Sequence, residues 1–130
     1  MISRPKKQIR VAIFARQSVD KGDGSEFGSI EAQREAGEAY IVSQKALGWV
    51  ALPKHYVDLG VSGKTTHRPA FRELLADIEA GAVDVVLVYK LDRLSRSLAD
   101  LTRLLKFFEQ HGVQLVSVTQ AIDTSGSGGR

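Results

Sequence analysis

The run from Val83 to Tyr89 limits most strongly what this chain can fold into. It reads Val-Asp-Val-Val-Leu-Val-Tyr, so most of it is apolar at consecutive positions rather than at alternate ones. A strand that is apolar on both faces is typical of a parallel sheet with helices on each side. Gly81 precedes the run and a polar cluster follows it. We therefore predict a buried strand here, at the centre of a sheet.

Strand-like and helix-like segments alternate along the rest of the chain. Further strands are predicted over 9–15, 49–57 and 113–119, and Pro53 favours an edge position or a late start for the second of them. Three segments favour helices: 29–47, opened by Ser29 and closed by Gly48; about 71–80, with an apolar stripe from Phe71 to Ile78; and the stripe Leu94, Leu98, Leu101, Leu105 and Phe108, closed by Gly112. This alternation predicts an α/β fold, a mostly parallel sheet of about four to five strands with helices on both faces.

A single domain is predicted over residues 9–124. A basic tail precedes it at 1–8, and a flexible tail rich in glycine and serine follows at 125–130. Two polar segments rich in glycine, 19–28 and 58–67, are predicted to be loops.

Composition excludes several classes of protein. The 18 Lys and Arg against 15 Asp and Glu give a net charge of +3, a weak argument for a polyanionic partner. The absence of cysteine removes disulfides, thiolate metal ligands and a cysteine nucleophile. No apolar stretch approaches the roughly 20 residues that cross a bilayer, and the polar start lacks a signal-peptide core. We therefore expect a soluble, cytoplasmic protein with no membrane partner.

The ends of two predicted strands carry most of the reactive side chains. Ligands of open α/β sheets bind beyond the carboxyl ends of the strands. The first strand leads to Arg16 and Ser18, which are two residues apart and point to the same side if the extended conformation continues. The central strand leads to Asp92, Arg93 and Arg96, and a helix beginning near Asp92 would place Asp92 and Arg96 one turn apart.

Arginines gathered at such an edge suit a phosphodiester. The guanidinium donates two parallel hydrogen bonds and stays charged at physiological pH. Attack on phosphorus builds negative charge on the non-bridging oxygens, which fixed guanidinium groups stabilise without a metal. Ser18 is then a candidate nucleophile. A hydrolase triad is poorly supported, because the one histidine near these motifs is His67, beside Arg68.

Each of these features also has a structural interpretation. The pattern of Asp92 and Arg96 is, by itself, most often a surface ion pair. A serine such as Ser18 is commonly a turn residue or a helix cap. Asp20 and Asp23 miss the ligand spacing of a calcium loop, and no paired carboxylate or histidine motif indicates a two-metal nuclease, so no metal is expected.

Two other functions compete with phosphodiester chemistry. Gly63-Lys64-Thr65 matches the end of a P-loop, but the first glycine of that motif would fall at Asp58. A P-loop-like NTPase would bind Mg-ATP through Lys64. A non-catalytic nucleic-acid-binding α/β domain would bind DNA without cutting it.

Several short motifs also occur in a characteristic order and spacing. They are F-A-R-Q-S (14–18), S-I-E-A-Q (29–33), D-L-G-V-S-G (58–63), H-R-P (67–69) and Y-K-L-D-R-L-S-R-S (89–97). Together they resemble the resolvase/invertase family of serine site-specific recombinases, over residues 9 to about 124. The resemblance implies a resolvase-like catalytic domain that cuts and rejoins DNA.

The resemblance also implies a role for each site residue. Ser18 would attack a DNA phosphate, forming a 5′-phosphoserine link and freeing a 3′ hydroxyl, with no ATP, metal or other cofactor. Asp92 would orient an arginine or carry the proton for the leaving group. Gln33 and Ser62 would support the same pocket. The phosphate-binding arginines would be Arg16, Arg68, Arg93 and Arg96.

The chain departs from the family pattern in two places. Phe14 stands where the family commonly has Tyr, which removes only a hydroxyl. The sequence stops at Arg130, where family members continue into a dimerisation helix and a DNA-binding region, so a truncated chain is expected. The segment Val19–Gly28 and the sequence S-I-E-A-Q-R-E resemble large phage-type integrases or transposon recombinases more than compact resolvases.

The resemblance further implies partners and a cellular setting. Double-stranded DNA at specific recombination sites would be the substrate, in a bacterial or phage system, with the protein at the nucleoid. A full-length protein would form a homodimer at each site and a homotetramer during strand exchange. The shorter chain is compatible with a monomer.

Overall fold

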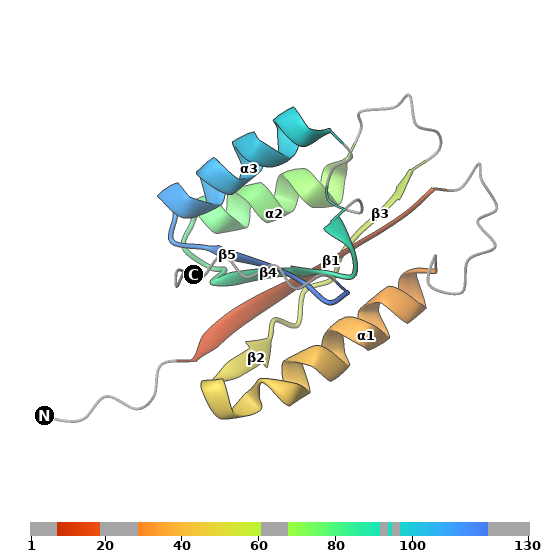
Figure 1. The fold of residues 1–130 in the computed structure, drawn as a ribbon, viewed down its shortest axis with the longest axis vertical. Coiled ribbons are helices and arrows are strands. Elements are labelled where there is room, and N and C mark those ends of the chain that lie inside the picture. The colour runs from red at the N-terminus through yellow and green to blue at the C-terminus, as the bar shows by residue number, and fades with distance from the viewer. Residues whose placement is uncertain (1–7, 19–28, 61–67, 92–93, 95–96, 120–130) are drawn as a thin grey trace, which may run out of the picture.

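The computed structural model describes residues 8–18, 29–60, 68–91, 94 and 97–119. Strands and helices alternate through these residues (Figure 1). In chain order they are β1 (Ile9–Ser18), α1 (Ile30–Ser43), the 3₁₀ helix η1 (Lys45–Leu47), β2 (Trp49–Ala51), β3 (Tyr56–Gly60), α2 (Pro69–Glu79), β4 (Val85–Val88), α3 (Leu98–Gln110) and β5 (Gln114–Ser117). The α/β class predicted from the sequence is confirmed.

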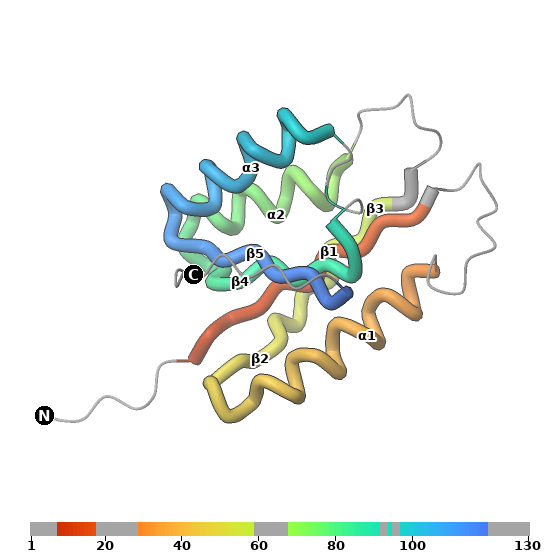
Figure 2. The backbone as a smooth tube through the Cα atoms, in the orientation of Figure 1, coloured from red at the N-terminus to blue at the C-terminus, as the bar shows by residue number. Residues whose placement is uncertain are grey.

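The sheet has five strands, and every pair in it is parallel. The order is β2-β1-β4-β5, and β3 pairs with the second half of β1. Figure 2 shows β3 beside the carboxyl-terminal half of β1. The predicted strand over 83–89 is present as β4, and all four of its residues are buried. β4 shares the interior of the sheet with β1, which is longer and pairs with three strands.

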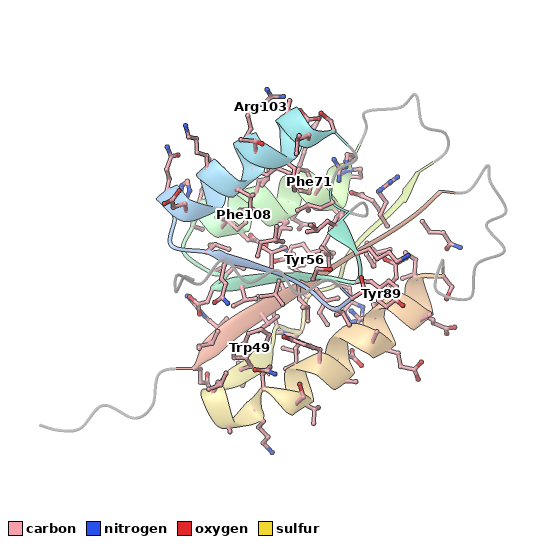
Figure 3. The ribbon with its side chains drawn as sticks, viewed as in Figure 1. Trp49, Tyr56, Phe71, Tyr89, Arg103 and Phe108 are labelled. Atoms are coloured by element: carbon pink, nitrogen blue, oxygen red, sulfur yellow. The ribbon has the colours of Figure 1, made fainter. Side chains whose placement is uncertain are left out.

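Helices cover both faces of the sheet, as predicted. Helices α2 and α3 lie on one face and α1 on the other (Figure 1). Alternate residues of β1 divide between the two cores: Ala12 and Phe14 pack on the side of α2 and α3, whereas Val11 and Ile13 pack on the side of α1. Figure 3 labels Phe71 and Phe108 on the side of α2 and α3, and Trp49 on the side of α1. Strand β1 is therefore buried on both faces of the sheet.

Two predicted boundaries differ from the structure. The strand predicted over 49–57 is two strands, β2 and β3, separated by a segment that contains Pro53, whose ring nitrogen has no hydrogen to donate to a ladder. β3 then continues to Gly60, so the loop predicted from Asp58 begins later. The rest of that loop, and the predicted loop over 19–28, lie outside the described residues.

The third helix begins later than the sequence suggests. The Ser97 backbone is extended, and its side chain accepts a hydrogen bond from Asp100 N, so Ser97 caps α3 and the helix starts at Leu98. Leu94 is fully buried ahead of the helix, whereas Leu98 is 79% exposed. The predicted helix start near Asp92 falls outside the described residues. The helix ends as predicted, with Gly112 at a φ of 69°, where a side chain would be strained.

A polar cluster ties the segment before β3 to helix α2. The Tyr56 hydroxyl donates to Asp77 at 2.6 Å, and Lys54 Nζ lies 2.8 Å from Asp77 and 2.9 Å from Glu73. Burial raises the pKa of the Tyr56 hydroxyl, and its hydrogen bond to Asp77 raises that pKa further. The neutral phenol is thus the form that the fold stabilises.

Substituting phenylalanine for Tyr56 should change how stability depends on pH. An unfolded tyrosine ionises near pH 10, while the folded pKa is higher, so the folded protein loses stability as pH rises above about 10. Tyr56→Phe should cost about 1 kcal/mol at pH 8 through the lost hydrogen bond. Urea unfolding should show this difference closing by pH 11. A difference that is the same at both pH values would contradict the prediction.

Candidate active site

The carboxyl ends of β1 and β3 lie side by side. In the parallel register Arg16 is opposite Asp58, and Ser18 is opposite Gly60. β1 remains a strand through Ser18, so the extended backbone continues beyond residue 15, where the predicted strand ends. Arg68, at the N-cap of helix α2, lies close enough to Arg16 for the two charges to interact.

Gln33 holds the backbone at Arg16. Its Oε1 accepts from Arg16 N at 3.2 Å, and its Nε2 donates to Arg16 O at 3.0 Å. Arg10 O accepts from Asp84 N on the β4 side, so by the alternation of a parallel ladder the N–H and C=O of Arg16 also face that side. β4 stops at Val88 and does not reach them. The amide of Gln33 therefore takes the place of a neighbouring strand.

Helix α1 places Gln33 beside the Arg16 backbone because the helix has a capped N-terminus and packs closely on the sheet. Ser29 caps the helix by accepting from Ala32 N at 3.1 Å. Gly37, one turn after Gln33, faces Ile13 of β1, and a Cβ at Gly37 would lie only 3.2 Å from the Ile13 side chain. The absence of a side chain at Gly37 thus lets α1 approach the sheet. The resulting burial leaves Gln33 1% exposed.

Replacing Gln33 with leucine should destabilise the fold by about 2 kcal/mol. Two buried backbone groups of Arg16 would lose a partner, and each such loss costs about 1 to 3 kcal/mol, offset by the apolar surface that leucine buries. Urea unfolding of the chain measures the change. Gln110→Leu, at an exposed position of α3, is the matched control and should change stability by less than about 0.5 kcal/mol. Equal stabilities of the two variants would contradict this role for Gln33.

Asp58 supports the start of helix α2. It is 3% exposed, and its two carboxylate oxygens accept from Ala70 N at 2.9 Å and from Phe71 N at 3.0 Å. Arg68, at the N-cap position, makes no capping hydrogen bond with its side chain. Sequence reasoning assigned no role to Asp58. The sequence did carry a signal: Asp58 directly follows the strand predicted over 49–57, and the helix start at Arg68 and Pro69 offers no capping side chain of its own.

Arg68 is enclosed by groups from three segments. Its Nη2 donates to Leu94 O at 2.7 Å, and its Cζ lies 4.2 Å from the centre of the Phe71 ring and 5.8 Å from that of Phe14. Its Nε is buried and has no hydrogen-bond partner among the described residues. Burial lowers the pKa of the guanidinium, and the positive charge of Arg16 lowers it further.

The two arginines make this edge of the sheet favourable for an anion. An anion bridging Arg16 and Arg68 would remove the repulsion that now lowers the pKa of Arg68. A shallow recess lies beside Arg68, lined by Arg68, Phe71, Asp100, Arg103 and Leu104. Asp100 pairs with Arg103 on α3. The arrangement can bind a phosphate group and stabilise added negative charge on it.

The structure describes only part of the site predicted from the sequence. It places Arg16, Gln33 and Arg68 together, and it places the backbone of Ser18 at the end of the same strand. Ser62, Asp92, Arg93 and Arg96 lie outside the described residues. Leu94, which the sequence places between Arg93 and Arg96, contacts Arg68 through its carbonyl oxygen.

In the part of the chain that the structure describes, no group of three His, Cys, Asp or Glu side chains is arranged to hold a metal ion. None of the helices in that part of the chain has the length and hydropathy that a bilayer crossing requires.

Comparison with known families gave one clear match. The model of the resolvase N-terminal domain family matches residues 11–130. The chain is 39% identical over 70 residues to the DNA-invertase hin of Salmonella typhimurium, a match that covers 54% of this chain and 36% of the relative. It is 43% identical over 70 residues to a resolvase/recombinase of Pseudomonas putida, covering 54% of this chain and 38% of the relative. The matches thus span little more than a third of each relative.

Solved structures show the same fold over most of the chain. The N-terminal catalytic domain of TP901-1 integrase superposes with a TM-score of 0.74 at 39% identity, covering 91% of this chain and 84% of that domain. A resolvase family site-specific recombinase from Streptococcus pneumoniae superposes with a TM-score of 0.70 at 27% identity, covering 92% of this chain and 78% of the other.

Proposed function

The chain belongs to the resolvase N-terminal domain family, and from that membership we propose that it is the catalytic domain of a serine recombinase. The proposed activity is site-specific DNA recombination. Ser18 attacks a backbone phosphate, a 5′-phosphoserine link forms, and the 3′ hydroxyl is released. Rejoining is the reverse attack by a 3′ hydroxyl from another DNA end.

The coupling of Arg16 and Arg68 is the observation that carries this proposal. Arg16 comes from the end of a central strand and Arg68 from the start of a helix on one face of the sheet. They are close enough for the charge of Arg16 to lower the pKa of Arg68. Such an arrangement is stabilised by a bound phosphate, and a pentavalent phosphorus centre with more negative charge is stabilised further.

The remaining residues have distinct proposed roles. Gln33 positions Arg16 and the strand that leads to Ser18, by holding the Arg16 backbone. Arg93 and Arg96 bind the same phosphate, and Ser62 supports the pocket. Asp92 orients an arginine or carries the proton to the departing 3′ oxygen. No metal or ATP is required in this scheme, because each phosphodiester broken is replaced by a phosphoserine ester.

The proposed substrate is double-stranded DNA at specific recombination sites. Relatives of the chain are named DNA-invertases, resolvases and integrases, and strand exchange between two sites requires several catalytic subunits. We therefore propose a homodimer at each site and a homotetramer during exchange for the complete natural protein. A nucleoid location follows from the substrate.

Trapping the covalent intermediate tests the proposed function. The complete natural protein is incubated with a nicked duplex that carries its recombination site, so that the cleaved end diffuses away and rejoining fails. We expect protein attached to the 5′ end, in the presence of a metal chelator and without ATP, with the adduct mapped to Ser18 by mass spectrometry. Ser18→Ala should abolish trapping. Ser43→Ala, at an exposed serine of α1, should leave trapping unchanged.

The experiment can contradict the proposal in two ways. An adduct that survives Ser18→Ala would remove the assignment of the nucleophile. Cleavage by the unsubstituted protein that requires a divalent metal would contradict the metal-independent scheme.

A further inference from the structure

The surroundings of Phe71 are unusual for a core side chain. It is 8% exposed and belongs to the core between the sheet and helices α2 and α3. Its ring contacts Phe14 edge-on, with centroids 5.6 Å apart and an interplanar angle of 65°. The guanidinium of Arg68 lies over the ring at 4.2 Å. Phe71 is thus the nearer of two aromatic rings that face this charged group of the proposed active site, the Phe14 ring being 5.8 Å away.

The guanidinium of Arg68 has few other supports. Its Nη2 donates a hydrogen bond to Leu94 O, and its Nε has no partner among the described residues. One hydrogen bond at Nη2 fixes the place of that nitrogen but does not by itself fix the orientation of the guanidinium plane. Contact with the face of a ring restricts that orientation, because the ring fixes the plane in which the guanidinium lies.

The charges around Arg68 pull its guanidinium in different senses, so a contact that restrains the group affects where it lies. Arg16 repels Arg68, whereas Asp58 and Asp100 attract it. Asp58 already accepts from two backbone N–H groups, and Asp100 pairs with Arg103. In the absence of phosphate, repulsion and partial burial both disfavour the position that Arg68 occupies. The negative face of an aromatic ring offsets part of this cost, and an aliphatic side chain of similar volume would not.

We propose that Phe71 is a positioning residue of the active site, whose ring face holds the Arg68 guanidinium in the plane and position in which it meets the scissile phosphate. Phe71 touches neither DNA nor the reacting atoms in this arrangement. It acts through Arg68. The inference rests on the proposed function for its effect on catalysis, and on the geometry alone for its effect on Arg68.

A series of fluorinated phenylalanines at position 71 tests the proposal. Successive fluorines weaken the attraction of a ring for a cation while changing its shape little. The substitutions are 4-fluoro-, 3,5-difluoro- and 3,4,5-trifluorophenylalanine in the complete natural protein, and the measurement is the rate of adduct formation on the nicked duplex. The logarithm of the rate should fall steadily along the series, with a total loss of about three- to thirty-fold. Phe71→Tyr, which keeps the ring face, should retain most of the rate.

Phe108 provides the matched control. It is 1% exposed in the same core but contacts Phe107 rather than Arg68. The same fluorinated series at position 108 should leave the rate unchanged. A flat series at position 71, or equal slopes at the two positions, would overturn the proposal, because a purely structural ring responds to its shape and not to its electrostatics.

A second measurement separates this inference from the proposed function. Urea unfolding of the 130-residue chain, with each fluorinated residue at position 71, is compared between Arg68 and Arg68→Met backgrounds. The unfolding equilibrium constant should rise by about three- to thirty-fold along the series with Arg68 present and should stay constant with Met. This result would support the contact between Arg68 and Phe71 even if Ser18→Ala still formed adducts. Such adducts would contradict only the proposed function. Parallel responses in both backgrounds would overturn the role of Phe71.

Discussion

Replacing Arg68 with lysine is expected to slow adduct formation by about 10²- to 10³-fold, the range seen when one donor to a developing negative charge is removed. Lysine keeps the positive charge, so the loss isolates the contribution of the planar fork. The guanidinium now donates to Leu94 O, and its Cζ lies over the Phe71 ring at 4.2 Å from the ring centre. An ammonium group can make only one of these contacts well, and it cannot donate two parallel bonds to a phosphate.

Arg72→Lys is the control for this prediction. Arg72 lies one turn further along α2 and is exposed. Its substitution should change the rate less than about twofold, given the small effects typical of surface substitutions. Single-turnover trapping measures both variants, and circular dichroism confirms that each is folded. An Arg68→Lys protein that cleaves as fast as the unsubstituted one would remove Arg68 from the proposed mechanism.

Asp58→Ala should have the largest effect on stability, a loss of about 4 kcal/mol. Its carboxylate accepts from two backbone N–H groups at the start of α2, and hydrogen bonds to a charged group contribute about 1.5 to 3 kcal/mol each. The negative charge also lies at the positive end of the helix dipole. The alanine variant would leave two buried N–H groups without an acceptor.

Urea unfolding of the chain measures this loss. Asp58→Asn keeps one acceptor oxygen and should lose about half as much. Asp100→Ala removes a carboxylate from the first turn of another helix, but this carboxylate is exposed and its ion pair with Arg103 is at the surface, so the loss should be below about 1 kcal/mol. Equal losses for the Asp58 and Asp100 variants would show that burial at Asp58 has no special effect.

Local patterns predicted most of the fold because the residues that form each element also carry its signal. The apolar run at β4 and the stripe of α2 needed no knowledge of distant partners. Leu98 shows where such a signal fails: it fits the periodicity of α3 but lies in the first turn, beyond the edge of the core. The capping serine at position 97 decided the boundary instead.

The candidate site was predictable in its residue types and less so in its contacts. The strand-end rule and the family resemblance pointed to Arg16, Gln33 and Arg68, which the structure brings together. The pairing of Gln33 with the Arg16 backbone spans 17 residues, and that of Asp58 with Ala70 spans 12. These pairings depend on where β4 stops and how α2 docks, which are properties of the assembled sheet and not of any local segment.

The two hydrogen bonds of the Gln33 amide hold the end of β1 on the edge that β4 leaves open. From Ile9 to Ile13 this strand is paired with β2, with β4 or with both, whereas from Phe14 to Ser18 β3 is its one strand neighbour in the described chain. Two hydrogen bonds between neutral groups contribute about 1 to 3 kcal/mol, a small fraction of the 5 to 15 kcal/mol that typically holds a domain folded. Breaking these two bonds would leave the β1–β4 and β1–β3 ladders intact, so the paired ends of β1 and β3 could shift together without separation of the strands at the centre of the sheet.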